Sequence, residues 1–215
     1  MVGGHTRNIG KTSVVEGIIR GMPEMNWTAV KITQFGHGIC SINGAACGCA
    51  VGEHQFSISE EQNRDTGTDT ARLLAAGARH SLWVRTKQGE LITALPAFKR
   101  RIEDAEFVIV ESNSLRRFMT PTVYLQVLDT SNPDFKLSAQ QFFDLSDAFV
   151  LVERNGGLAV ASPSTALLAR EIEKNKPCFT VREEDRFISG EVVEFVRSKL
   201  AVGEQDVARR FQPAC

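Results

Sequence analysis

The chain has 215 residues, 42% of them hydrophobic and 24% charged, which is enough to bury one α/β core. Its formal net charge of −1 provides no overall positive field for nucleic acid or an anionic membrane. The longest apolar runs have the length of strands, far below the roughly 20 residues of a membrane helix. The glycine-rich N-terminus also differs from a signal peptide. We therefore expect a cytoplasmic protein whose five cysteines are thiols or metal ligands.

The first predicted element is a glycine-rich turn that leads into a helix over residues 11–21. Glycines let successive backbone N–H groups point into one concavity, and the helix directs its positive end to the same place. Lys11 would reach the outer phosphates of a nucleotide, and the Thr12 hydroxyl would hold Mg²⁺. The alternative is an ordinary glycine turn before a helix. The predicted nucleotide-binding residues of this turn are Gly4, His5, Thr6, Arg7, Asn8, Ile9, Gly10, Lys11, Thr12 and Ser13.

The spacing of this turn departs from the usual phosphate loop. The pattern G-x-x-x-x-G-K-[ST] requires glycine at position 5, where the chain has His5, and Gly4 comes one residue early. In addition, only Met1 and Val2 precede Gly3, whereas the buried strand before such a loop needs about five apolar residues. We therefore expect the first strand to be truncated and the true start of the protein to lie upstream of Met1.

The rest of the chain alternates short apolar strands with amphipathic helices, which predicts an α/β fold with a mainly parallel sheet. The predicted strands cover 27–31, 82–84, 105–111, 122–128, 148–152 and 178–181, and the predicted helices after the first cover 68–77, 91–103, 138–145, 163–174 and 190–200. We expect one nucleotide-binding domain over residues 1–200, followed by a tail over 201–215.

Residues 32–64 lack periodicity and are predicted to form an irregular functional loop. Cys40, Cys47, Cys49 and His54 gather within this loop. Thiolates and an imidazole in a set of four ligands suit Zn²⁺ or another soft metal, and the neighbouring glycines would let the loop fold around it. The spacing matches no common zinc module, so small buried cysteines are the alternative.

Three charged residues are predicted to meet at the carboxyl ends of strands, where open α/β sheets gather their chemistry. Lys31 ends the second predicted strand, Asp69 opens the helix after the irregular loop, and Glu111 ends the strand 105–111. We predict that Lys31 joins Lys11 in catalysis and that Asp69 and Glu111 bind Mg²⁺ with Thr12. Lys31 as a solvated lysine and Asp69 as a helix cap are the alternatives. A carboxylate that continues a buried strand, as Glu111 does, is costly unless it is paired.

These motifs together resemble the P-loop NTPases that include dethiobiotin synthetase, cobyrinic acid amide-forming enzymes and the B protein of molybdopterin-guanine dinucleotide biosynthesis. Lys31, Asp69 and Glu111 match the positions that serve phosphates and magnesium in dethiobiotin synthetase. The segment 67–78 and the segment 177–181 look more like the molybdopterin protein. The resemblance implies a three-layer P-loop NTPase fold and, commonly, a homodimer. Ile32 and the Ser112-Asn113 dipeptide depart from dethiobiotin synthetase, which places its substrate in doubt.

The predicted activity is Mg²⁺-dependent binding and slow hydrolysis of ATP or GTP, in an accessory protein of cofactor or metal-centre biosynthesis. Asn155, after the strand 148–152, could read the nucleotide base, or it could be a turn residue before two glycines. Two alternatives stay open: an ATP-dependent ligase of the dethiobiotin synthetase type acting on a small carboxylate or amine, and a non-catalytic nucleotide-binding module. The second substrate or partner protein is unknown, and we expect neither nucleic acid nor membrane as a partner.

Overall fold

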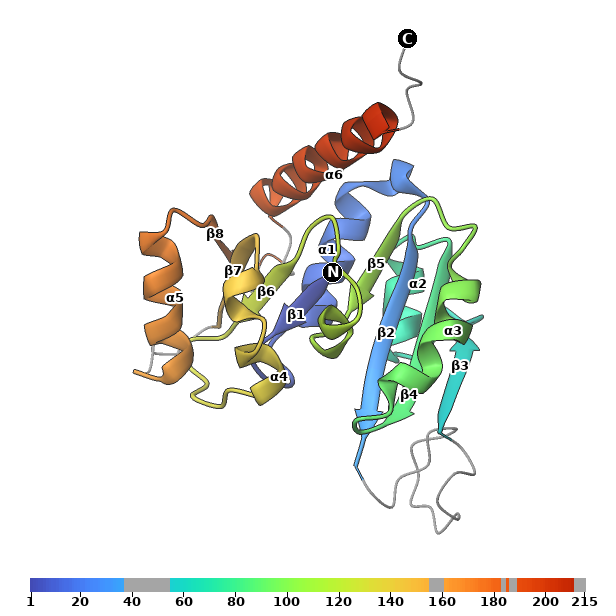
Figure 1. Cartoon of the computed structure of the whole chain (residues 1–215), viewed down its shortest axis with the longest axis horizontal. Helices are drawn as coiled ribbons and strands as arrows, with labels where there is room; N and C mark the ends of the chain where they lie inside the picture. Colours follow the sequence, from blue (N-terminus) through green and yellow to red (C-terminus); the bar gives the residue numbers. More distant parts are fainter. Residues whose placement is uncertain (37–54, 155–160, 183–184, 186–188, 211–215) are drawn as a thin grey trace. The chain divides into compact units, whose positions relative to one another are not determined.

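The computed structural model describes residues 1–36, 55–154, 161–182, 185 and 189–210, with the backbone alone for 203–210. The chain forms two compact units. Unit 1 consists of Met1–Met22 and Thr120–Cys215, and unit 2 consists of Pro23–Met119. Each unit has its own strands and helices, and Figure 1 labels them.

Unit 1 contains four parallel strands in the order β1-β6-β7-β8. Val2 of β1 lies beside Leu125 of β6, and Leu125 lies beside Ala148 of β7. The strands are β1 (Val2–Gly4), β6 (Leu125–Leu128), β7 (Ala148–Glu153) and β8 (Cys178–Arg182). The helices are α1 (Lys11–Gly21), α4 (Leu137–Gln140), α5 (Pro163–Glu173) and α6 (Gly190–Arg210), with a short 3-10 turn at Phe143–Leu145.

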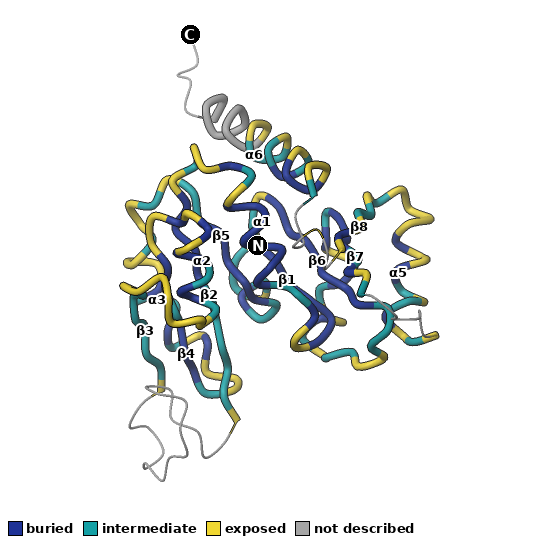
Figure 2. The backbone as a smooth tube through the Cα atoms, turned by 180° about the vertical axis from the view of Figure 1, so that it is seen from behind, coloured by how far each residue is buried: buried dark blue, intermediate teal, exposed yellow. Residues whose placement is uncertain are grey.

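An aromatic and aliphatic core holds the β7 side of unit 1 together. Leu128, Phe143, Phe149 and Leu168 are all at most 6% exposed, and the rings of Phe143 and Phe149 are 4.8 Å apart. Burial of side chains of this size contributes about 1.5–3 kcal/mol each. Strands β1 and β6 are dark blue in Figure 2 because all their residues are buried, whereas much of α5 is exposed.

Unit 2 contains four strands in the order β3-β4-β2-β5. Strands β2, β4 and β5 are parallel, and β3 pairs antiparallel with β4 at the edge. The strands are β2 (Thr28–Phe35), β3 (Phe56–Glu60), β4 (His80–Lys87) and β5 (Val108–Glu111), and the helices are α2 (Asp69–Ala75) and α3 (Leu91–Arg101), with 3-10 turns at Pro23–Met25 and Ser114–Arg117. Figure 1 shows α2 and α3 on opposite faces of these strands.

Residue alternation explains the two faces of unit 2. Successive side chains of a strand point to opposite faces, and the Ser81 hydroxyl of β4 donates to the Thr70 carbonyl of α2 at 2.8 Å. Phe56 and Ile58 of β3 belong to the other face, where they approach Ala97 of α3. Both faces are therefore covered by helices, as expected for parallel strands.

The predicted α/β class with mainly parallel strands is confirmed, and the elements occur in the predicted order. β2 continues to Phe35, past the predicted end at Lys31, because it pairs along its whole length with β4. β3 lies inside the predicted irregular loop, where Phe56 and Ile58 alternate with serines in the pattern of a half-buried strand. The one-domain organisation of residues 1–200 stays a prediction.

Three further boundaries differ from the predictions. Gly3 and Gly4 lie in β1, so the loop is shorter than the glycine-rich sequence suggested. The predicted helix 138–145 is interrupted at Phe142, which has φ −126° and ψ 14°. The backbone of α6 continues to Arg210 instead of ending at residue 200. Within the described residues, no helix is long and apolar enough to cross a membrane.

The contact between α1 and α6 gives a stability prediction. A Cβ atom on Gly21 would lie 2.5 Å from Cγ2 of Val193, whose side chain is 7% exposed. We expect Gly21→Ala to lower the free energy of unfolding by about 1–3 kcal/mol in chemical denaturation, because the buried valine must move. Gly190→Ala, where an added Cβ meets nothing within 4 Å, is the matched control. Val193→Ala should relieve most of the loss, and full additivity of the two substitutions would contradict the proposed clash.

Candidate functional site

The turn between β1 and α1 has the backbone of an anion-binding loop. Gly10, immediately before α1, has φ 90° and ψ 10°, and Asn8 has φ 57°. The helix's own hydrogen bonds begin with the Val14 N–H, which donates to the Gly10 carbonyl at 2.9 Å. The N–H groups of the first turn therefore point out of the helix end, and no acidic residue lies in that turn. This end of α1 favours a negatively charged ligand.

The Lys11 side chain folds back across Gly4. A Cβ atom at Gly4 would lie 2.6 Å from Cδ of Lys11 and 2.9 Å from Cδ1 of Ile9, so only glycine leaves room for the lysine stem. The Lys11 Nζ donates to the Thr6 carbonyl at 2.7 Å. The early glycine in the sequence thus places the ammonium group over the loop.

His5 takes the place of the usual glycine by turning its side chain into the protein. The imidazole is fully buried, with Nε2 3.2 Å from the Asn132 carbonyl and Nδ1 3.5 Å from the Asp129 N–H. Burial is the main reason why the pKa of His5 falls below its ordinary value of 6.5. The ring is therefore neutral and donates through Nε2. The His5 side chain contacts Asn132 and Asp129 and so supports the loop. Any role of His5 in nucleotide binding therefore falls to its backbone and stays a prediction.

Strand β6 and the segment after it hydrogen-bond to the loop. The His5 N–H donates to the Val127 carbonyl at 3.1 Å, and the Lys136 N–H donates to the His5 carbonyl at 2.9 Å. The Thr6 hydroxyl donates to the Asp134 carboxylate. These bonds use polar groups of His5 and Thr6, whereas the Arg7 side chain is exposed to solvent.

Arg154 connects three segments around the loop. Its Nε donates to Asp129 at 3.0 Å, and its Nη2 donates to the Asn8 carbonyl at 2.8 Å. Sequence reasoning missed both residues of this pair. Asp129 directly follows the buried strand β6, which is the same signal that singled out Glu111. The signal for Arg154 was weaker, since it consisted only of its position after β7.

Positive charge also gathers at the loop. Burial lowers the pKa of Lys136, and the charge of Arg7 lowers it further, against a partly opposing effect of Asp134. Arg7 therefore lies near enough to Lys136 for the two cations to repel each other. A bound anion would relieve this repulsion, since an opposite charge favours the charged form of a lysine.

In unit 2, the structure brings Lys31, Asp69 and Glu111 together as the sequence predicted. The Lys31 Nζ lies 2.5 Å from Asp69 Oδ2 and 3.0 Å from Glu111 Oε1. Burial would lower the pKa of Lys31, but the charges and hydrogen bonds of the two carboxylates outweigh it and raise the pKa above 10.5. Arg72 lies 3.5 Å from Asp69 as a second cation. Lys31 acts here from within β2 rather than from its end.

The remaining predicted site residues are divided between the described and undescribed parts of the chain. Thr12 and Ser13 are buried in the first turn of α1. Across residues 1–36, 55–154 and the later described segments, no three His, Cys, Asp or Glu side chains form a group that could hold a metal ion. The predicted ligands Cys40, Cys47, Cys49 and His54, and the predicted base-reading residue Asn155, lie outside the described residues. Their roles stay predictions.

Comparisons with known proteins assign no family. No protein-family model matches the chain, and no curated protein matches it significantly. Among solved structures, one that matches is HypB from Helicobacter pylori in complex with nickel, with a TM-score of 0.45 and 12% sequence identity. That match covers 100% of this chain and 89% of the HypB chain. A likeness of this size does not assign a function, so the functional argument depends on the loop itself.

The buried imidazole gives a pH prediction. A histidine whose pKa is lowered by folding stabilises the protein fully above its ordinary pKa of 6.5, and this contribution is lost as the pH falls below 6.5. We expect His5→Gln, which keeps a donor for the Asn132 carbonyl, to show a smaller fall in Tm than the wild type between about pH 7.5 and 5.5. Parallel curves of Tm against pH would contradict a buried neutral His5.

The Lys31 cluster gives a second stability prediction. Lys31→Met leaves Glu111, whose side chain is 5% exposed, without its ammonium partner. We expect a loss of about 3 kcal/mol in chemical denaturation, because a buried carboxylate that loses an ion-pair partner is strongly destabilised. Lys87→Met, on the neighbouring strand, is the matched control. Adding Glu111→Gln to Lys31→Met should restore part of the loss, and an effect of Lys31→Met no larger than that of the control would contradict the pairing.

Proposed function

We propose that the chain binds a magnesium nucleoside triphosphate at the β1–α1 loop and hydrolyses it slowly, as an accessory protein of cofactor or metal-centre biosynthesis. The observation that carries the proposal is the position of Lys11. Its stem crosses Gly4 and its ammonium group contacts the Thr6 carbonyl beside the start of α1. A helix N-terminus and a lysine on one concave loop are the combination that binds polyphosphates.

The loop residues fit a triphosphate chemically. Lys11 would exchange the neutral Thr6 carbonyl for a phosphate oxygen, which forms a stronger, charge-assisted bond. Arg7 and Lys136 would add positive charge to the same ligand. The Thr12 hydroxyl would hold Mg²⁺, which neutralises charge on the phosphate oxygens. Ser13 and the backbone of residues 5–11 complete the proposed nucleotide site.

Lys31, Asp69 and Glu111 are proposed as the catalytic and metal residues of unit 2. Asp69 and Glu111 place two carboxylates beside Lys31, and carboxylate oxygens are the ligands that Mg²⁺ prefers. In this proposal Asp69 and Glu111 bind Mg²⁺, and Lys31 stabilises charge on the transferred phosphoryl group. Asp69 is the more accessible of the two carboxylates, with a side chain 41% exposed.

A ligase of the dethiobiotin synthetase type is the second candidate. The observation in its favour is the contact of Lys31 with Asp69 and Glu111, because these residues match the positions expected from that enzyme. The accessory function is preferred because the cysteine-rich segment has no role in the ligase. Zn²⁺ or another soft metal bound by that segment, a homodimer, and a choice between ATP and GTP remain parts of the proposal that need their own tests.

Thermal unfolding with nucleotide tests the loop. We expect millimolar Mg²⁺ with ATP or GTP to raise the Tm, because a ligand at a hundredfold excess over its Kd stabilises the folded state by about 2.7 kcal/mol. Lys11→Ala should abolish the shift. Arg170→Ala, which removes an exposed cation from α5 in the same unit, is the matched control and should retain it. The absence of a shift with both nucleotides in the wild type would contradict the proposed site.

Turnover separates the candidate functions. Slow hydrolysis that needs no added small molecule favours the accessory protein, whereas turnover only with a small carboxylate or amine favours the ligase. Nucleotide binding without turnover indicates a non-catalytic module. Asp69→Ala and Glu111→Ala should weaken the dependence of nucleotide affinity on Mg²⁺, and an unchanged dependence in both variants would remove them from the metal site.

A further inference from the structure

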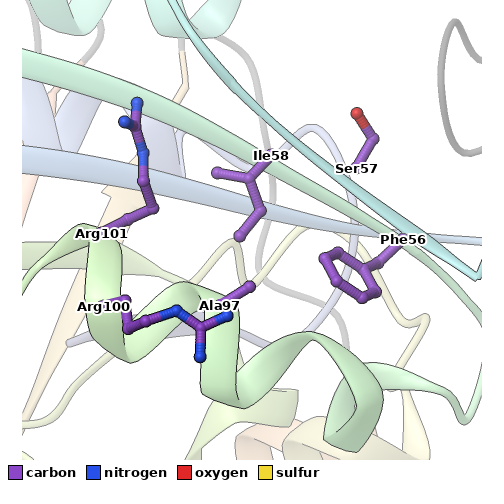
Figure 3. A pocket seen from close by; sticks show the side chains of 6 residues that line it. All are labelled: Phe56, Ser57, Ile58, Ala97, Arg100 and Arg101. Atoms are coloured by element: carbon purple, nitrogen blue, oxygen red, sulfur yellow. The ribbon is translucent and has the colours of Figure 1, made fainter.

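A groove lies between the edge strand β3 and helix α3 of unit 2. Figure 3 shows the side chains of Phe56 and Ile58 pointing from β3 toward α3, with Ala97 opposite them and Ser57 pointing away. Arg100 and Arg101 complete the lining, and the cavity has a volume of about 540 Å³. The groove is therefore apolar on its floor and positively charged on its helical side.

The backbone of β3 is oriented to accept another strand beside this groove. In an antiparallel pair, residues alternate between those bonded to the partner and those whose N–H and C=O point away from it. The Lys87 N–H donates to the Gln55 carbonyl, and the Glu61 N–H donates to the Ser81 carbonyl. The backbone N–H and C=O groups of the odd-numbered residues of this strand therefore point toward β4. The N–H and C=O groups of Phe56, Ile58 and Glu60 therefore point outward from the sheet. Two of these residues also line the groove.

Among the residues that the structure describes, the outer edge of β3 carries little of the usual protection against strand addition. Natural edge strands carry lysine, proline or a bulge. β3 reads Phe-Ser-Ile-Ser-Glu, its pairing with β4 is regular, and in the described ranges no strand pairs with its outer side. An extended segment placed there would gain backbone hydrogen bonds and direct alternate side chains into the groove.

The positive charges of the groove favour an added strand that carries an acidic side chain. The Arg101 guanidinium forms an ion pair with the Glu60 carboxylate at 2.9 Å, which offsets part of its positive charge. Arg100 has no hydrogen-bond or ion-pair partner among the described residues. An acidic side chain two residues away from an apolar one would lie on the same face of an added strand. The apolar group would then contact Phe56, Ile58 and Ala97, while the carboxylate would contact Arg100.

We propose that β3 and α3 form a docking site for an extended segment of a partner protein, in which an apolar and an acidic side chain lie two residues apart on the same face. The segment adds to the outer edge of β3 and places these side chains in the groove. This site is separate in its residues from the proposed nucleotide site, so it does not depend on nucleotide binding.

A defined peptide tests the proposal. The probe is a short capped peptide in which threonines alternate with valine and glutamate, titrated by fluorescence anisotropy and by ¹⁵N NMR of the full chain. We expect binding that slows hydrogen exchange of the Phe56, Ile58 and Glu60 amides. The same peptide with lysine for glutamate should bind up to about fivefold more weakly, since an exposed ion pair contributes up to about that factor. The same peptide with N-methylated amides on its pairing edge should also bind more weakly, because it cannot form the backbone hydrogen bonds of an added strand.

Charge reversal on the protein provides the second arm. Arg100→Glu should weaken the glutamate peptide and strengthen the lysine peptide, each by about fivefold. Arg79→Glu, an exposed position of unit 2 that does not line the groove, is the matched control and should change neither affinity. Lys11→Ala should bind the peptide with the affinity of the wild type. Peptide binding therefore tests the docking site even if the proposed nucleotide site is wrong. If Arg100→Glu does not fold, the affinities of the lysine peptide and the N-methylated peptide for the wild-type chain still test the proposal.

Four results would overturn the proposal. They are no binding of the glutamate peptide at millimolar concentration, equal binding of the glutamate and lysine peptides by the wild type, binding without protection of the three β3 amides, and self-association in sedimentation that Arg100→Glu removes. The last result would assign the groove to a second copy of this chain. Binding of hexanoate at Phe56 and Ile58, with no peptide binding, would assign it to a small amphipathic carboxylate.

Discussion

The loop between β1 and α1 depends on one constraint: its buried peptide groups must find hydrogen-bond partners inside the protein if its exposed groups are to bind an anion. A buried N–H or C=O without a partner costs about as much as a lost hydrogen bond. The His5 N–H and C=O meet that requirement through Val127 and Lys136, which come from the segment around the end of β6. The loop conformation is thus fixed by residues more than one hundred positions away in the sequence.

The unusual spacing of the glycines follows from the same constraint. A glycine at position 5 would have no imidazole to contact Asn132 and Asp129, whereas His5 fills that space as a neutral ring. The requirement for a residue without a side chain moves to Gly4, because the Lys11 stem occupies the volume of its missing Cβ. Relative to the common phosphate-loop pattern, the position without a side chain is therefore Gly4, and the next residue, His5, supplies a buried ring.

Sequence reasoning predicted what local periodicity and residue chemistry determine. It placed α1 at Lys11, found the strands and helices in order, and selected Lys31, Asp69 and Glu111, which the structure brings together. It failed at β3, because the alternation of Phe56 and Ile58 with serines covers only five residues and follows a long stretch without periodicity. It also missed the contacts of Arg154 with Asp129 and Asn8, because a contact between residues separated by up to 146 positions leaves no local pattern.

The two units use their half-buried lysines differently, and this difference bears on what each can bind. In unit 2, Lys31 is neutralised by two carboxylates, so an incoming anion would have to displace them. At the loop of unit 1, Lys11 contacts a neutral carbonyl, and Arg7 and Lys136 repel each other. Replacing a neutral acceptor with a phosphate oxygen increases the strength of the bond, and it also removes the repulsion. Electrostatics therefore favours the loop of unit 1 over the Lys31 cluster of unit 2 as the place where phosphates would bind.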